Sequence, residues 1–477
     1  MADGHPGGNL VSLGAIQVFR IASGMAVNVM VMRGLGLDGF GVYGYVTTLV
    51  GLASFASSMG MDRLLKREIA RDPALAGRYV ATALGATALL SGVTSIGIVA
   101  WAAAVDGRPL VIGACALAAL SMTMTALDVI PVAYFHAIRR MKLGVSGNGA
   151  GRLMLVLATG AGLALGWGVP AMFGAQLLDG TVTFVILWRI YRGLDTPPLQ
   201  TSWDEVIGLI RTSIPFGFNS LFVSIYLSAD VMLVAHYAPT SDWLSTTNDT
   251  EVGIYRGAVM LLTMITVVAE TYSTGVYPRM ARHLGDPGEA GRELSFATRI
   301  LLAFSVPVAV GGFLTAKPLL VLIGGAAYAA SAAPFALMIP LMPMRFLSNG
   351  FGMTLTALDH QEDRTRGAFV AAFLNIAVNL WAVPRYGAMG AAGTTLLTET
   401  VLYLWMHWRV LPLVTGLALG QSLLRVGIPV AVMAGVILAL PPMQVVLKIG
   451  IGVGVYGAVG LLSGAVSRAD IPRLRGV

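Results

Sequence analysis

Residues 79–105 read YVATALGATALLSGVTSIGIVAWAAAV, a run without any charged side chain. A helix of about 20 mostly apolar residues crosses the hydrocarbon core of a membrane, so this run predicts a membrane-spanning helix. Similar apolar runs occur along the whole chain. The predicted spans lie at roughly 10–32, 40–61, 79–105, 110–136, 147–166, 168–189, 212–236, 252–277, 296–316, 332–358, 366–382, 387–408, 421–440 and 443–463.

The composition of the chain is also typical of a membrane protein. Of its 477 residues, 56% are apolar and 12% are charged, which is about half the charged share of a soluble domain. A soluble chain of this length could not cover its surface with so few charges. The composition therefore excludes an ordinary globular enzyme, a disordered protein and a fibrous protein. The single cysteine, Cys115, excludes an internal disulfide.

Lysine and arginine are distributed unevenly between the two sides of the membrane that the spans define. With the N-terminus inside, the inside segments 63–78, 139–142 and 279–299 are rich in arginine, whereas the outside loop 237–251 has neither residue. The positive-inside rule therefore predicts that both termini are cytoplasmic. No loop is long enough to hold a soluble domain, so we expect no catalytic residue, no metal site and no enzymatic activity.

The two halves of the chain resemble each other. Gly41-Val42-Tyr43 opens the second predicted span, and Gly253-Ile254-Tyr255 opens the eighth, 212 residues later. An even number of spans in each half gives both halves the same orientation, so we predict a parallel repeat with a site between the lobes. The predicted regions are an N-lobe at 1–195, a C-lobe at 196–415, and two extra spans with a tail at 416–477.

These observations predict an all-α polytopic membrane protein. It should contain about 14 transmembrane helices, arranged as two six-helix lobes related by a parallel pseudo-twofold repeat, plus two C-terminal helices. Polar side chains form stripes at helical spacing inside the spans. Arginine makes bidentate hydrogen bonds to phosphate, so these stripes predict an anion-binding cavity. The candidate substrate-binding residues are Arg20, Arg345, Arg256, Gln17, Asn28, Asn219, Asn349 and Tyr43.

Four carboxylates within the predicted spans are candidates for ion coupling or for a counter-charge: Asp230, Glu270, Asp179 and Glu399. Placing an ionisable group inside a membrane costs free energy, so each such carboxylate is expected to have a functional or structural role. Each carboxylate could exchange a proton or Na⁺ and so couple transport to an ion gradient. Each could instead neutralise a buried arginine in a structural ion pair. Both interpretations stay open for Asp230 and Glu270, and the structural one is favoured for Asp179 and Glu399.

Three motifs are similar to those of polysaccharide flippases. The run 35–43 resembles the signature L-G-x-x-x-F-G-x-Y, and the run 60–71 resembles the segment that ends the second span in that family. Asn375, Asn379 and the run 384–392 resemble its N-x-x-x-N and P-x-x-G-x-x-G-A-A patterns. On these motifs the chain is identified as a member of the multidrug/oligosaccharidyl-lipid/polysaccharide (MOP) exporter superfamily, in its Wzx-like O-antigen and exopolysaccharide branch.

The resemblance implies a flippase for an undecaprenyl-diphosphate-linked oligosaccharide. Such a protein carries its substrate from the inner to the outer leaflet of the bacterial cytoplasmic (inner) membrane by alternating access. Spans 1, 2, 7 and 8 would line the cavity, with Arg20 matching the first-helix arginine of the related peptidoglycan-precursor flippase. Gly24, one turn further on, departs from the additional basic residues of that relative. The last two spans resemble the pair that forms a lipid-tail groove there.

The same resemblance implies the partners of the protein. They are the lipid-linked substrate, membrane lipid and the polysaccharide polymerase or export machinery, and no nucleic acid. We expect a monomer without a cofactor, in which H⁺ or Na⁺ coupling is open.

Three functions other than a flippase are considered for this sequence. A cation-coupled multidrug antiporter of the same fold would need acidic cavity walls, for which Asp230 and Glu270 are available. A membrane enzyme of glycan assembly would need a sizeable outer loop, and the sequence has none. A non-transporting membrane component of glycan assembly would have no need for polar stripes inside its spans.

Overall fold

The computed structural model describes residues 6–194, 196–239, 248–282 and 285–465, with the backbone alone at 6–18, 63, 215–223, 226–227, 271 and 274–278. The described residues form helices joined by short connections and contain no strand. The predicted all-α fold is therefore confirmed. The chain divides into two compact units, one of Met1–His236 with Asp242–Gly253, the other of Tyr237–Ser241 with Ile254–Val477.

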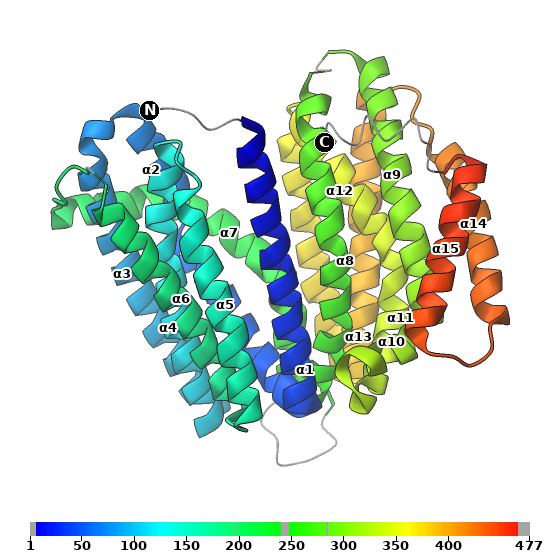
Figure 1. Ribbon diagram of the computed structural model, residues 1–477, viewed down its shortest axis with the longest axis horizontal. Coiled ribbons are helices and arrows are strands. Elements are labelled where there is room, and N and C mark those ends of the chain that lie inside the picture. Colours follow the sequence, from blue (N-terminus) through cyan, green and yellow to red (C-terminus); the bar gives the residue numbers. More distant parts are fainter. Residues whose placement is uncertain (1–5, 195, 240–247, 283–284, 466–477) are drawn as a thin grey trace. The chain divides into compact units, whose positions relative to one another are not determined.

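The helices of the first unit pack as a bundle in which α3 to α6 lie side by side (Figure 1). The apolar core at one end of this bundle includes Leu65, Val80, Phe135 and Tyr191, which come from four different helices. The helices of the unit are α1 (Pro6–Ser58), α2 (Met61–Arg71), α3 (Ala76–Trp101), α4 (Pro109–Ala137), α5 (Leu143–Ala164), α6 (Gly168–Arg192) and α7 (Trp203–Tyr237).

Small residues bring α5 and α6 close together. A Cβ on Gly147 would lie 2.7 Å from the Leu187 side chain, and a Cβ on Gly151 would lie 2.1 Å from Thr183 Oγ1. Helices in a membrane gain little from burying apolar surface against each other, so they associate through such close backbone packing. The glycines at this spacing therefore hold the bundle together.

Helix α1 contains two of the predicted spans in one bent helix. The bend is at Gly36, whose φ of 68° and ψ of −171° are not helical. Glycine adopts a positive φ without the steric cost that a Cβ imposes, which explains why the chain bends here. After α1, Gly60 again takes a positive φ and directly precedes the amphipathic helix α2.

The second unit is also helical, and its last two helices form a hairpin that packs on α9 (Figure 1). Its core includes Leu294, Phe351, Val410, Val426 and Met433. The helices are α8 (Asp249–Ala281), α9 (Pro287–Leu314), α10 (Ala316–Gly324), α11 (Ala332–Met338), α12 (Met342–Ala357), α13 (Gln361–Val410), α14 (Leu419–Ala439) and α15 (Val445–Ser463). The first turn of α8, up to Gly253, belongs to the first unit.

Proline and glycine shape the helices of the second unit in different ways. The predicted span 332–358 is broken into α11, a short 3-10 turn at Ile339–Leu341 and α12, because proline residues prevent continuous helical hydrogen bonding. The predicted spans 366–382 and 387–408 form the single helix α13, which bends at Gly387 (φ 53°). Pro307 does not interrupt α9, which continues through it.

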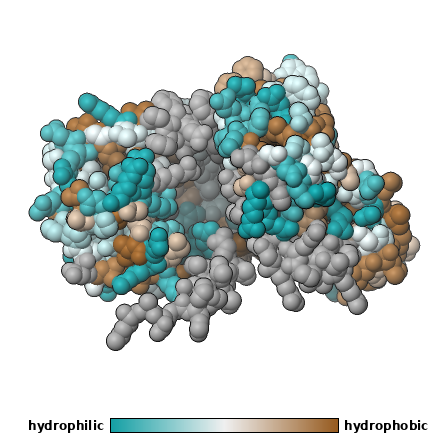
Figure 2. Space-filling model, turned by 90° about the horizontal axis from the view of Figure 1, so that it is seen from above, coloured by the Kyte–Doolittle hydropathy of each residue, from teal (hydrophilic) through white to brown (hydrophobic). Residues whose placement is uncertain are grey.

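Ten helical segments of the described chain are long and apolar enough to cross a membrane. Two of them, Phe19–Ser58 and Gln361–Leu413, contain 40 and 53 residues. At 1.5 Å per residue, each is about twice the length that the 30 Å hydrocarbon core requires, so each corresponds to two predicted spans. The number of about 14 crossings stays a prediction. Figure 2 looks onto the end of the helices that carries α2, where hydrophilic residues gather.

Candidate functional site

Arg20 lies on the part of α1 before the Gly36 bend, and its side chain is exposed. Its guanidinium has no ion-pair partner among the described residues. Asn28, two turns further along α1, is half-buried. An exposed guanidinium on an apolar helix can bind a phosphate, by donating hydrogen bonds to it, without first breaking a protein ion pair. The role of these two residues in substrate binding stays a prediction.

Tyr43 points into the first unit. Its side chain is 5% exposed, its ring stacks on Phe173 with 5.2 Å between centroids, and its hydroxyl accepts a hydrogen bond of 3.0 Å from Gln176 Nε2. These contacts join α1 to α6. Tyr43 therefore has a clear packing role, and its predicted contact with substrate stays a prediction.

An ionisable group of three residues lies between α4, α5 and α6. Arg152 Nη1 is 3.4 Å from Asp179 Oδ2, and Asp128 interacts electrostatically with both residues. The structure therefore pairs Asp179 with an arginine, as the structural interpretation of this residue expects. Asp128 is not among the residues predicted from the sequence, although a carboxylate in the middle of the apolar run 110–136 is a signal in itself.

Arg345 and Glu399 form an ion pair in the second unit. Arg345 Nε donates a hydrogen bond of 3.0 Å to Glu399 Oε1, and the two side chains are 23% and 5% exposed. Glu399 lies on α13 and Arg345 on α12, so the pair ties these helices together. Asn349 is one turn beyond Arg345 and half-buried. An anionic substrate would have to compete with Glu399 for the arginine.

The remaining candidate residues lie on α1, α7 and α8. Asp230 is buried on α7, Arg256 is half-buried on α8, and Glu270 is exposed on α8. The side chains of Gln17 and Asn219 lie outside the described residues. In the described part of the chain, no group of histidine, cysteine and carboxylate side chains is arranged to hold a metal ion.

An apolar groove of about 320 Å³ lies in the second unit, between α9 and the α14–α15 hairpin. Its walls include Pro307, Gly311, Met433, Ile437 and Gly452. Most of the described residues that line it are apolar, so it suits a hydrocarbon chain. The groove lies on the helices that the resemblance relates to a lipid-tail groove.

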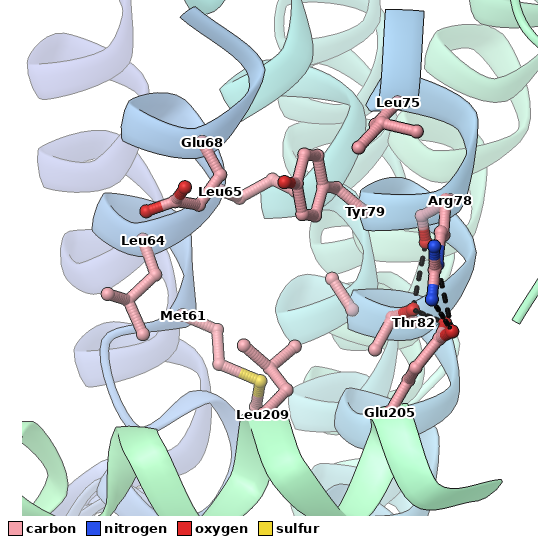
Figure 3. A pocket seen from close by; sticks show the side chains of 11 residues that line it. Met61, Leu64, Leu65, Glu68, Leu75, Arg78, Tyr79, Thr82, Glu205 and Leu209 are labelled. Carbon is pink, nitrogen blue, oxygen red and sulfur yellow. Dashed lines mark hydrogen bonds and ion pairs between the residues drawn. The ribbon is translucent and has the colours of Figure 1, made fainter. Parts of the chain in front are cut away.

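A second cavity, of about 400 Å³, lies in the first unit between α2, α3 and the start of α7 (Figure 3). Arg78 on α3 and Glu205 on α7 face each other at its edge, with 2.8 Å from Arg78 Nε to Glu205 Oε1. Thr82 Oγ1 donates to the other carboxylate oxygen over 3.3 Å. The Arg78 guanidinium lowers the pKa of Glu205. We call Arg78, Thr82 and Glu205 the Glu205 clamp.

The fold is shared with solved membrane transporters. The lipid II flippase MurJ, in an inward closed conformation, has a TM-score of 0.77 at 12% identity, covering 94% of this chain and 98% of its own. An inward-facing multidrug resistance transporter of the MATE family has a TM-score of 0.61 at 14% identity, covering 82% and 94%. A MOP superfamily transporter from Pyrococcus furiosus has 0.55 at 15% identity, covering 86% and 97%. The fold is that of a multi-pass MOP superfamily transporter.

Sequence profiles place the chain within this class. The profile of the polysaccharide biosynthesis protein family matches residues 8–284, and that of the MatE family matches residues 215–381. The chain belongs to the polysaccharide biosynthesis protein family. No curated protein matches its sequence. The superfamily predicted from the motifs is confirmed, and because the related families transport substrates, the protein is a transporter and not an enzyme.

Proposed function

We propose that the protein is a flippase for an undecaprenyl-diphosphate-linked oligosaccharide, of the Wzx-like branch. The observation that carries this proposal is the match to the polysaccharide biosynthesis family over residues 8–284. The shared fold with MurJ, over 94% of the chain, supports a lipid-linked substrate. The substrate would move from the inner to the outer leaflet of the bacterial cytoplasmic membrane, by alternating access.

The chemistry of the substrate matches two features of the chain. A diphosphate cannot cross about 30 Å of hydrocarbon unaided, because charge is expensive there. Arg20 is exposed and unpaired among the described residues, so it is our first candidate to hold the diphosphate. The apolar groove between α9 and α14–α15 offers space for part of the prenyl chain.

We further propose that Asp128 and Asp179 provide the coupling to H⁺ or Na⁺. Asp128 and Asp179 share the single positive charge of Arg152. One further cation would balance the charge of this group. Neutralising Asp128 as Asp128→Asn should make transport independent of the ion gradient. Glu270→Gln tests the alternative coupling carboxylate on α8.

Flipping in proteoliposomes tests the proposed function. A fluorescent lipid-diphosphate oligosaccharide is placed in one leaflet, and its accessibility from the other leaflet is followed over time. We expect transport by the wild type and a loss of about ten-fold or more in Arg20→Ala, since a charge-assisted contact to a diphosphate is removed. Arg282→Ala, an exposed arginine beyond the end of α8, is the matched control. No flipping by folded wild type would overturn the proposal.

A cation-coupled multidrug antiporter is the second candidate. The MatE match over residues 215–381 favours it, and Asp230 and Glu270 both lie within that range. Efflux of a fluorescent organic cation from the same vesicles distinguishes the two functions. Efflux that Glu270→Gln abolishes, without flipping of the lipid-linked substrate, would establish the antiporter.

A further inference from the structure

The start of α8 crosses α1 just after the Gly36 bend, and the crossing is reciprocal. A Cβ on Gly41 would lie 1.8 Å from the carbonyl oxygen of Asp249, and a Cβ on Gly253 would lie 2.2 Å from that of Leu37. Asp249 and Gly253 follow Leu37 and Gly41 by 212 residues, which is the offset of the sequence repeat. The repeats therefore meet through corresponding residues, which we call the glycine crossing.

A hydrogen bond accompanies this crossing. Thr250 Oγ1 donates to Asp38 Oδ1 over 2.6 Å, and these residues are again 212 positions apart. Both residues are exposed, so water competes for the bond and it stabilises the crossing only weakly. A stronger contact lies beside it.

Arg108, on the connection between α3 and α4, holds two carboxylates at once. Its Nε donates to Asp106 Oδ1 over 2.8 Å, and its Nη2 donates to Asp249 Oδ1 over 3.1 Å. The exposed fractions of the side chains are 0% for Asp106, 30% for Arg108 and 16% for Asp249. Burial opposes the charge on Arg108, but hydrogen bonds to both carboxylates outweigh it and raise the pKa of the guanidinium. We call these three residues the Arg108 clasp.

The clasp lies where the chain passes from one unit to the other. Asp249 belongs to the first unit, as do Arg108 and Asp106, whereas α8 belongs to the second unit from Ile254 onward. A transporter that alternates between two states must change the packing of its repeats. Packed contacts switch between discrete arrangements and do not deform continuously, so the half-buried pair of Arg108 and Asp249 suits such a change.

We propose that the Arg108 clasp is a latch of the transport cycle. While Arg108 holds Asp249, the glycine crossing is closed. Opening the crossing requires Asp249 and the first turn of α8 to leave Arg108. The latch rests on the transport function proposed above, but not on the identity of the substrate.

Thiol labelling tests the latch without any substrate. Val252 is 0% exposed on the first turn of α8, so Val252→Cys in a Cys115→Ala background reports opening of the crossing. We expect Arg108→Gln to speed labelling roughly ten-fold or more, since it removes the guanidinium charge that holds Asp106 and Asp249 together. Arg108→Lys, which keeps the charge, should label more slowly than Arg108→Gln. Arg78→Gln, which breaks an ion pair at the other end of α3, should label at the background rate.

A second experiment tests the latch by locking the glycine crossing in its closed state with a disulfide. Asp38→Cys with Thr250→Cys, also in the Cys115→Ala background, is oxidised to fix the crossing shut. We expect transport to stop in the oxidised protein and to return on reduction. Equal labelling of Arg108→Gln and background would overturn the latch, as would undiminished transport by the oxidised protein. If the wild type flips no lipid-linked oligosaccharide, the proposed function fails, while the labelling still decides the latch.

Discussion

The Arg108 clasp and the Glu205 clamp use the same chemistry at opposite ends of α3, and they differ in burial. Arg78 and Glu205 are 53% and 26% exposed. In the clasp, Arg108 and Asp249 are 30% and 16% exposed and Asp106 is fully buried. An exposed ion pair contributes little, because water solvates both partners once they separate. A buried pair is expensive to break, because each charge is left without solvent. The clasp can therefore define a conformational state, whereas the clamp only holds the start of α7 against α3.

The largest effect should come from removing the centre of the clasp. Arg108→Leu removes the positive charge between Asp106 and Asp249, which should lower the free energy of unfolding by about 3 kcal/mol. This value is the lower end of the range for a broken buried ion pair, because Arg108 is partly exposed. Thermal unfolding in detergent measures the loss. Adding Asp249→Asn should recover part of it. A loss no larger than that of Arg78→Leu would erase the distinction between clasp and clamp.

The next largest effect should come from the glycine crossing. Gly41→Ala places a methyl group against the backbone of Asp249, and moving backbone should cost about 1–3 kcal/mol. Gly253→Ala should cost a similar amount, because its contact with Leu37 is the reciprocal one. Gly51→Ala, on the same helix with nothing within 4 Å of the added Cβ, is the control. Unequal losses at Gly41 and Gly253 would show that the two sides of the crossing are not equivalent.

A much smaller effect is expected at the clamp. Arg78→Gln and Glu205→Gln should leave thermal stability in detergent unchanged within error, because Arg78 is exposed and Glu205 is half-buried, so water screens the pair. Their effect should appear instead as faster hydrogen exchange in the first turn of α7, which the clamp attaches to α3. A clear loss of thermal stability would show that the cavity of Figure 3 buries this pair more deeply than its exposure suggests.

The smallest effect is a dependence on pH. Hydrogen bonding to Arg78 lowers the pKa of Glu205 from its ordinary value of 4.5. The stabilisation by this carboxylate is therefore complete above pH 4.5 and is lost as the pH falls through the lowered pKa. The difference in hydrogen exchange of the first turn of α7 between wild type and Glu205→Gln should therefore shrink on acidification below 4.5. A difference that grows in acid would contradict the assignment.

Much of the fold could be predicted from the sequence, because the membrane imposes it. A lipid-exposed backbone must satisfy its own hydrogen bonds, so each long apolar run becomes a helix. Gly41 and Gly253 indicated the repeat, and the reciprocal crossing agrees with it. The bends at Gly36 and Gly387 were not predicted, since a gap between two apolar runs does not reveal whether the helix continues through a positive φ.

The candidate site was less predictable, because it depends on contacts between helices. Helical spacing grouped residues on a face, but it could not show that Tyr43 bonds to Gln176 inside the first unit. It could not pair Arg345 with Glu399 either, since the two are far apart in the sequence. Asp128 was overlooked in an otherwise apolar run, and only the packing of α4 against α6 places it near Asp179.

The glycine crossing has the form of a homodimer interface contained in one polypeptide. In a twofold dimer, the same surface patch is used by both subunits. If residue i of one subunit contacts residue j of the other, then residue j of the first also contacts residue i of the second. Residues 37–41 and 249–253 keep this pattern, and two copies of a single lobe could build the same crossing from one shorter gene. A single chain that contains both repeats can place different residues at equivalent positions, which identical subunits cannot. At one pair of equivalent positions, Asp38 is an acceptor and Thr250 is its donor, where two identical subunits would set aspartate against aspartate.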